Sequence, residues 1–257
     1  MSATNAIVRP PGANFAEGLT TAGMGAPILE TALEQHERYC EALRRCGLTL
    51  TTLEPLLHHP DSTFVEDAAV LTDRWAILAR PGAASREGEV PSIRQALSRW
   101  HASFHEIAPP GTLDGGDVCQ AGEQFFIGVS GRTNEEGAGQ LGRLLARENH
   151  ESTRIDIRGI DGLLHLKSGI AYLGDNRLAA IDALAGCEAF RRYEIVRVEA
   201  TEKYAANCVR VNEHVLLAAG HPVLEDALRN IGYSVITLDM SEFQKMDGGL
   251  SCLSLRF

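Results

Sequence analysis

The sequence predicts an α/β fold made of five copies of one ββαβ module. Five segments share one order of features, a polar or glycine-rich start followed by short apolar strands and turns. These segments open at residues 66, 114, 165, 207 and 252, at intervals of roughly 45 residues. A nearly constant interval of this length indicates that one supersecondary unit is repeated along the chain.

Each of the first four segments is expected to form a β-hairpin whose turn contains Asp, Asn or Gly, the residues that turns favour. The expected turns lie at 72–74, 121–123, 174–176 and 212–213. A helical pattern follows each hairpin, and a third short strand follows the helix. The expected helices are 92–102, 134–149, 182–192 and 222–230, and the strands after them are 104–107, 153–157, 194–198 and 234–238.

The fifth segment reaches residue 257 before a helix begins, and the start of the sequence offers the missing parts. There we expect a strand at 6–9, an amphipathic helix at 26–46 and another strand at 48–53. Joining the two ends completes the fifth module, so we expect a closed ring, a five-module α/β propeller, sealed by the terminal strands. Radial repetition protects sheet edges and turns equivalent positions toward one channel, where the module openings would meet.

Composition favours a single globular domain over 1–257, because 257 residues with 44% hydrophobic content can bury a large core. No apolar run approaches the roughly 20 residues needed to cross a bilayer, and the first stretch lacks a leader pattern, so we expect a cytoplasmic protein without a membrane partner. Six cysteines without CxxC spacing suggest neither a zinc site nor disulfides. A net charge of −10 without clustered Lys and Arg argues against a nucleic-acid partner.

One thiol, one imidazole and one carboxylate fall at the module openings, in Cys252, His165 and Asp114. In such a set the thiolate attacks an electrophilic carbon, the imidazole moves protons and the carboxylate orients the imidazole. Each residue also has a structural explanation: the cysteine as a small apolar side chain, the histidine as a hydrogen-bonded core residue, and the aspartate as a cap of its Gly-Gly turn. Their equivalent positions in the repeat favour the catalytic interpretation.

Further charged residues suggest a cationic substrate. Asp61, Glu66 and Asp67 offer carboxylates that can hold a planar guanidinium by paired hydrogen bonds and fix its carbon over the sulfur. The alternative for Glu66 and Asp67 is a solvated start of a hairpin. Arg86 and Arg132, each after a hairpin, are candidates for binding an α-carboxylate, and the alternative for both is an ordinary surface charge.

Five ordered motifs that span nearly the whole chain resemble those of the dimethylarginine dimethylaminohydrolases, members of the guanidino-group-modifying superfamily. They are DSTFVED at 61–67, LDGGD at 113–117, HLKS at 165–168, AANC at 205–208 and DGGLSC at 247–252. The resemblance implies the pentein fold, and hydrolysis of asymmetric dimethylarginine or monomethylarginine to citrulline and an alkylamine through a covalent cysteine intermediate. It implies a methylated arginine as the small-molecule partner, and no cofactor or metal.

Carried over by motif, the resemblance implies Cys252 as nucleophile, His165 as general acid and base, and Asp114 as the carboxylate partner of the histidine. Some relatives carry Glu in place of Asp114, and its longer side chain has a longer reach. The resemblance further implies a lid residue, Leu19, and a backbone site for the α-amino group at Met246 and Asp247. The full expected substrate-binding set is Leu19, Asp61, Glu66, Asp67, Arg86, Arg132, Ser168, Met246 and Asp247.

Three other functions stay open at this stage. An arginine deiminase would use similar chemistry on unmethylated arginine, but that family usually carries a helical insertion for which 257 residues leave little room. An agmatine deiminase has a substrate without a carboxylate for the two arginines to bind. A non-enzymatic five-module propeller would lack the catalytic cysteine and histidine. The sequence also leaves open whether the chain forms a homodimer and whether the thiol and imidazole capture zinc.

Overall fold

The computed structural model describes residues 3–257, which form two compact units. The terminal unit comprises the chain up to Val65 together with Val198–Phe257, and the central unit comprises Glu66–Arg197. Every described strand belongs to one of five three-stranded sheets, two in the terminal unit and three in the central unit. Five sheets are the number that the repeat predicts.

Four of the sheets share one topology, and the fifth, β11-β10-β9, has the same strand order. In the sheet β3-β4-β5, the first two strands form an antiparallel hairpin, and the third strand pairs in parallel with the second. The sheets β6-β7-β8 and β12-β13-β14 repeat this arrangement. In the sheet β15-β1-β2, the last strand of the chain pairs antiparallel with the first, with Ile7 opposite Leu255. The predicted ββαβ module and the pairing of the terminal strands are therefore confirmed.

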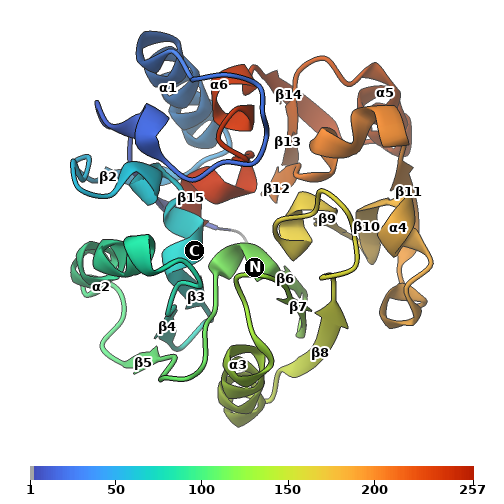
Figure 1. Cartoon of the computed structure of the whole chain (residues 1–257). Coiled ribbons are helices and arrows are strands. Elements are labelled where there is room, and N and C mark those ends of the chain that lie inside the picture. Colours follow the sequence, from blue (N-terminus) through green and yellow to red (C-terminus); the bar gives the residue numbers. More distant parts are fainter. Residues whose placement is uncertain (1–2) are drawn as a thin grey trace. The chain divides into compact units, whose positions relative to one another are not determined.

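The terminal unit carries two of these sheets, and α1 packs against β2 and β14 (Figure 1). Three phenylalanine rings of this unit, Phe15, Phe64 and Phe243, lie with centroids 5.5 to 6.4 Å apart and belong to its core. Its elements are β1 (Asn5–Val8), η1 (Phe15–Glu17), α1 (Leu29–Arg45), β2 (Thr49–Thr52), η2 (Pro60–Thr63), η8 (Ala200–Ala206), β12 (Val209–Val211), β13 (His214–Ala218), α5 (Pro222–Ile231), β14 (Ser234–Leu238), α6 (Ser241–Gln244), η9 (Ser251–Leu253) and β15 (Ser254–Arg256).

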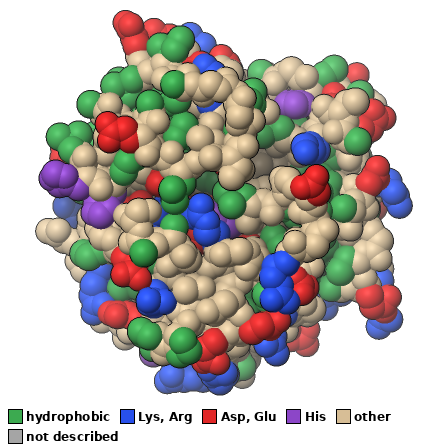
Figure 2. All heavy atoms as spheres, in the orientation of Figure 1, with side chains coloured by type: hydrophobic (Ala, Val, Ile, Leu, Met, Phe, Trp, Pro, Cys, Tyr) green, Lys and Arg blue, Asp and Glu red, His purple; other side chains and the backbone are tan. Residues whose placement is uncertain are grey.

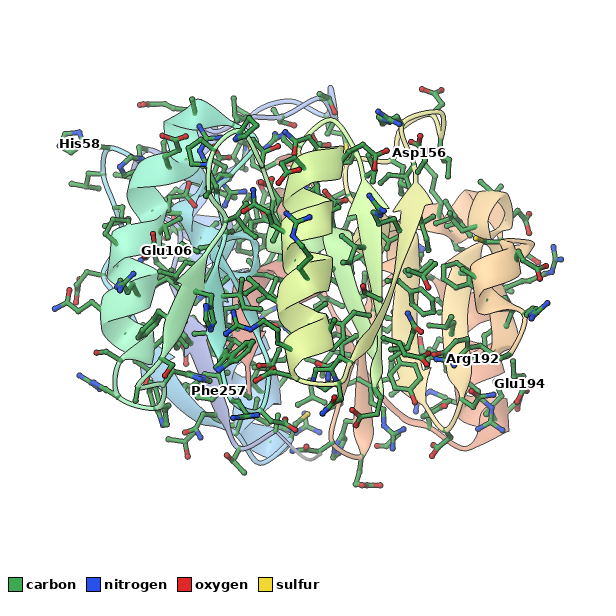
Figure 3. The ribbon with its side chains drawn as sticks, turned by 90° about the horizontal axis from the view of Figure 1, so that it is seen from below. His58, Glu106, Asp156, Arg192, Glu194 and Phe257 are labelled. Carbon is green, nitrogen blue, oxygen red and sulfur yellow. The ribbon has the colours of Figure 1, made fainter. Side chains whose placement is uncertain are left out.

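The central unit carries the other three sheets, with α3 packed on β7 and β8. Asp156 and Arg192 lie toward opposite ends of the strands of this unit in Figure 3. Asp156 is the last residue of β8. Arg192 forms an ion pair of 3.9 Å with Glu151, the first residue of β8. Its elements are η3 (Val65–Ala68), β3 (Ala69–Leu71), β4 (Ala76–Leu78), η4 (Ala84–Glu89), α2 (Val90–Leu97), β5 (Phe104–Glu106), η5 (Gly115–Asp117), β6 (Val118–Ala121), β7 (Gln124–Val129), α3 (Glu135–Arg147), β8 (Glu151–Asp156), η6 (Leu166–Ser168), β9 (Ile170–Gly174), β10 (Arg177–Ile181), α4 (Asp182–Ala185), η7 (Glu188–Phe190) and β11 (Glu194–Val198).

Two predicted elements differ in kind from the structure, and the helix expected at 92–102 already ends at Leu97. The helix expected at 182–192 is a single turn, α4, followed by the separate 3₁₀ turn η7, because the chain leaves the helix at Gly186. Cys252, expected on a strand, lies instead in the 3₁₀ helix η9. A short 3₁₀ helix precedes the first strand of every module, and the polar module openings lie within these helices or at their ends.

Among the described residues, the helices include none with the length and apolar character that a membrane crossing requires. Acidic and basic side chains are interspersed over the face seen in Figure 2. The net charge of −10 is therefore not gathered into a single acidic patch on that face.

Candidate active site

The terminal unit positions the predicted nucleophile through its neighbour in η9. Asn207 Oδ1 accepts a hydrogen bond from Ser251 N at 2.9 Å, and Asn207 Nδ2 donates to Ser251 Oγ at 3.1 Å. A Cβ at Gly249 would lie 2.5 Å from Asn207 Oδ1, so the close approach of this amide requires glycine there. The Asn207 side chain thus fixes the short helix that carries Cys252. Cys252 is buried, with 8% of its surface exposed.

A loop after η1 carries the predicted lid residue Leu19, and two aspartates hold it. Asp61 Oδ1 accepts from Leu19 N at 3.0 Å. Asp247 Oδ2 accepts from Thr21 N at 2.5 Å and from Thr21 Oγ1 at 3.0 Å. The Leu19 side chain is exposed and Met246 is buried. The structure therefore brings Asp61 and Asp247 to the loop that carries Leu19, and the contact from Asp247 is made by its side chain.

The central unit places His165 and Asp114 in contact. His165 Nε2 lies 3.0 Å from Asp114 Oδ2, and the other carboxylate oxygen accepts from Gly82 N at 2.8 Å. Asp114 makes no side-chain capping bond to η5, so the capping alternative for this residue is not seen. The shorter aspartate side chain does reach the imidazole.

The second glycine of the motif at 113–117 makes room for this imidazole. A Cβ at Gly116 would lie 2.7 Å from His165 Nδ1 and 2.7 Å from Asp67 Oδ1. The same residue donates its backbone N–H to Asp67 Oδ1 at 2.8 Å. A side chain at position 116 would therefore displace both the histidine and the aspartate.

Arg86 is buried in an ion cluster rather than lying on the surface. Its guanidinium contacts Asp67 Oδ2 at 2.6 Å through Nη1 and Glu89 Oε2 at 2.8 Å through Nη2. The Nε–H also donates to Glu89, at 3.0 Å. All three side chains are 3 to 4% exposed. The two carboxylates fix the plane of the guanidinium and compensate its charge.

The remaining residues of the predicted set in this unit lie near the same groups. Arg132 Nη1 is 3.5 Å from Asp114 Oδ2, and its side chain is partly exposed. Glu66 is buried and forms an ion pair of 2.7 Å with Lys167. Ser168 donates its backbone N–H to the carbonyl of His165 at 3.0 Å.

The charges around the imidazole stabilise its protonated form. Burial lowers the pKa of His165, but the negative charges of Asp67 and Asp117 and the hydrogen bond with Asp114 outweigh burial and raise the pKa from 6.5 to about 9. Burial raises the pKa of Asp67, but the positive charges of His165 and Arg86 outweigh burial and lower it to about 2. At neutral pH the site therefore holds an imidazolium, which can act as a general acid.

Asp67, Asp114 and His165 also have the residue types that bind metals. Their donor atoms lie within 4.8 Å of one another. Asp67 already contacts Arg86 and Gly116, and Asp114 contacts the imidazole, so a cation would compete with existing partners. We therefore assign these side chains to the hydrogen-bond network rather than to a metal site.

Arg86→Ala is expected to lower the free energy of unfolding by about 3 to 5 kcal/mol, because the truncation leaves two buried carboxylates without their cation. Urea unfolding monitored by circular dichroism measures the change. Arg143→Ala is the matched control, since its ion pair with Glu136 is exposed and worth at most about 1 kcal/mol. Equal losses in the two variants would contradict a stabilising role for the buried cluster.

Comparisons with known proteins agree with this geometry. The sequence matches none of the models of known protein families. It is 42% identical over 252 residues to an N(G),N(G)-dimethylarginine dimethylaminohydrolase of Pseudomonas aeruginosa, covering 98% of each chain. The chain belongs to the dimethylarginine dimethylaminohydrolase family. A member of this family from Streptomyces coelicolor is 34% identical, with 100% of this chain and 98% of the relative covered.

Solved structures extend the comparison to the fold. The Pseudomonas aeruginosa dimethylarginine dimethylaminohydrolase, as a cysteine-to-serine variant complexed with citrulline, matches with a TM-score of 0.97 at 40% identity and covers 100% of both chains. The fold is therefore that of this family, the pentein fold. The N-terminal domain of ArgZ, an arginine dihydrolase, has a TM-score of 0.89 at 20% identity, with 98% of this chain and 97% of that one covered, and shares the fold alone.

Sequence reasoning did not single out three residues that bind the candidate site residues or their neighbours within each unit. Lys167 and Asn207 lie inside quoted motifs, Lys167 two residues after His165 and Asn207 at the opening of the fourth module, and these positions were the available signal. Glu89 had no such signal, because an acidic residue three positions after an arginine is common on exposed helical turns. Only the burial of the turn η4 shows that Glu89 is a partner of Arg86.

Proposed function

We propose that this chain hydrolyses asymmetric dimethylarginine and monomethylarginine to citrulline, releasing dimethylamine or methylamine. The observation that carries the proposal is the 42% identity, over 98% of both chains, to an enzyme of that name. A related structure binds citrulline, the expected product. The contact between His165 and Asp114 adds a proton donor suited to an amine leaving group.

In the proposed mechanism, the Cys252 thiolate attacks the guanidinium carbon and forms a C–S bond. The C–N bond to the methylated nitrogen breaks as the His165 imidazolium gives that nitrogen its proton, and a thiouronium intermediate remains on the cysteine. The neutral imidazole then takes a proton from water, and the resulting hydroxide adds to the same carbon. The C–S bond breaks and releases citrulline, and the remaining proton passes to the amine in solution.

The relatives support the assignment of the two catalytic residues. One related structure carries a cysteine-to-serine substitution, and another is a histidine-to-glycine variant that forms an adduct with S-methyl-L-thiocitrulline. The substituted cysteine and histidine are separated by the same number of residues as Cys252 and His165 are here. This agreement supports Cys252 as the nucleophile and His165 as the general acid and base.

The charged residues supply the proposed substrate contacts. Asp61, Glu66 and Asp67 are buried carboxylates that suit a guanidinium. We propose that Arg86 and Arg132 bind the α-carboxylate. The expected contributions of Leu19 as a lid, of Ser168, and of the Met246 and Asp247 backbone at the α-amino group complete the proposed set.

We further propose that residues 1–257 act as one catalytic domain in the cytoplasm. The repeated strand order of the five sheets and the 98% coverage of a curated relative support a single domain. All six cysteines are free thiols, which suits a reducing compartment. Sedimentation would distinguish a monomer from the homodimer that the sequence leaves open.

Asymmetric dimethylarginine and monomethylarginine are expected to be hydrolysed efficiently, and symmetric dimethylarginine poorly. The asymmetric isomer keeps one unmethylated terminal nitrogen for the carboxylates. In the symmetric isomer a methyl group on each terminal nitrogen blocks a donor and leaves a buried acceptor unpaired, at a cost of roughly 1 to 3 kcal/mol. Citrulline formation from each compound measures kcat/KM, and the expected preference is roughly ten- to a hundredfold.

Unmethylated arginine is the comparison that separates the two candidate enzymes. The second candidate is a deiminase, and its support is limited to the fold shared with the arginine dihydrolase ArgZ. A clear preference for arginine would assign the chain to the deiminases. Equal rates for the two dimethyl isomers would contradict the argument from the unmethylated nitrogen.

A further inference from the structure

Asp117 is a fully buried carboxylate, 0% exposed, to which the proposed mechanism assigns no role. It ends η5, three residues after Asp114. Its Oδ1 accepts the backbone N–H of Leu166 at 2.9 Å, and its Oδ2 accepts the Ser130 hydroxyl at 2.7 Å. The first of these bonds reaches the residue next to His165.

The hydroxyl partners of Asp117 connect it to the other charged groups of the site. Ser130 Oγ accepts the N–H of Arg132 at 3.0 Å and that of Thr133 at 3.1 Å. The Thr133 side chain also forms a hydrogen bond to Asp117, in addition to the one from Ser130. The same hydroxyl, Thr133 Oγ1, accepts the N–H of Asp114 at 3.1 Å. One buried carboxylate thus anchors the backbones around Asp114, Arg132 and His165.

The neighbouring strand is shaped to admit this carboxylate. A Cβ at Gly128, on β7, would lie 2.8 Å from Asp117 Oδ1 and 2.9 Å from the Leu166 Cβ. The absence of a side chain at position 128 therefore lets η5 and η6 approach the same point of β7. Gly128 lies one residue before the end of that strand, beside the turn at 130–133.

We propose that Asp117 is a positioning residue for His165, because it fixes the histidine backbone through Leu166 and links it to the turn at 130–133. A negative charge on Asp117 favours the protonated imidazole. The proposal deepens the proposed function, since it gives the general acid a fixed anion beside Asp114. Asp117 does not touch the substrate in this role. It acts through the position and the charge state of the histidine.

Several charged groups of the central unit surround His165 and affect the pKa of its imidazole. Asp67 on η3 and Asp117 on η5 act on the imidazole through their charges, and Asp114 also accepts its hydrogen bond. Arg86 pairs with Asp67, and Arg132 lies near Asp114. Burial raises the pKa of Asp117 above its ordinary value, and the charge of His165 together with the three hydrogen-bond donors offsets only part of this rise.

The test compares Asp117→Asn with Ser130→Ala. Asparagine keeps the shape and one accepting oxygen but removes the charge, whereas Ser130→Ala removes one hydrogen bond and keeps the charge. The readout is the pH titration of the His165 imidazole, followed by NMR of histidine labelled with ¹³C. Asp117→Asn is expected to lower the midpoint by about one pH unit or more, and Ser130→Ala by clearly less. An unchanged midpoint in Asp117→Asn, or an equal shift in both variants, would overturn the proposal.

A measurement on the unaltered protein keeps the proposal testable if Asp117→Asn does not fold. The ¹³Cγ resonance of Asp117 is expected to report an ionised carboxylate throughout pH 6 to 8. A protonated carboxyl group in that range would overturn the proposal directly. Both titrations are made without substrate, so failure of the proposed dimethylarginine reaction would leave their outcome unaffected.

Discussion

Cys252→Ser is expected to lower citrulline formation by about 10⁴-fold or more. A hydroxyl has a pKa far above that of a thiol, so serine would not supply the anionic nucleophile that attacks the guanidinium carbon. The substitution changes one atom in η9, and the hydrogen bonds between Asn207 and Ser251 do not involve the sulfur. The fold is therefore expected to survive, which circular dichroism and thermal unfolding would check.

Cys208→Ser is the matched control for this variant. Cys208 is 2% exposed and directly follows Asn207, and it has no role in the proposed mechanism. Much of the turnover is expected to remain, with a loss of stability from the buried hydroxyl. Comparable loss of activity at both cysteines, or turnover by Cys252→Ser near the unaltered rate, would remove the basis for naming Cys252 the nucleophile.

His165→Ala is expected to stop the release of dimethylamine, because an amine needs a proton to leave and the imidazolium is the proposed donor. A loss of about 10³- to 10⁴-fold in kcat is the expected size. S-methyl-L-thiocitrulline offers a leaving thiolate that needs no such proton. With this compound the first step should partly recover, and the intermediate should accumulate because no base activates water.

Intact-protein mass spectrometry would detect that adduct as added mass on Cys252. The matched control is His58→Ala, which removes an exposed imidazole labelled in Figure 3 and should leave turnover within about twofold. Normal turnover of dimethylarginine by His165→Ala would contradict the proton-transfer role. The absence of any adduct with the thiocitrulline analogue would contradict the assignment of water activation to the same residue.

The repeat could be predicted because short apolar strands and a turn rich in Asp, Asn or Gly indicate a hairpin in each module. The third strands at 194–198 and 234–238 agree with the residue bounds of β11 and β14. The prediction of one helix over 182–192 was wrong. The apolar pattern continues across Gly186, but the helical backbone ends at Ala185 and a separate turn begins at Glu188. Short 3₁₀ helices such as η9 carry no periodic signal and escape this kind of reasoning.

Residue type and position in the repeat predicted which residues belong to the candidate site, but not the contacts that bury them. Asp114 and His165 stand at equivalent module openings, and the structure brings their side chains into contact. The burial of Arg86 between Asp67 and Glu89 depends on how η4 packs, which no local pattern encodes. Asp117 was visible in the motif at 113–117, but its links to Leu166 and Ser130 arise from tertiary packing.

The pairing of β1 with β15 governs the order in which the protein can fold during synthesis. β1 and β2 leave the ribosome early, yet their sheet is complete only after residues 254–256 have been made. The central unit is continuous in sequence, so it can fold while the rest is still being translated. A polypeptide released before residue 252 would lack both the proposed nucleophile and the closing strand. Its β1 would keep one unpaired edge, which is open to pairing with strands of other chains.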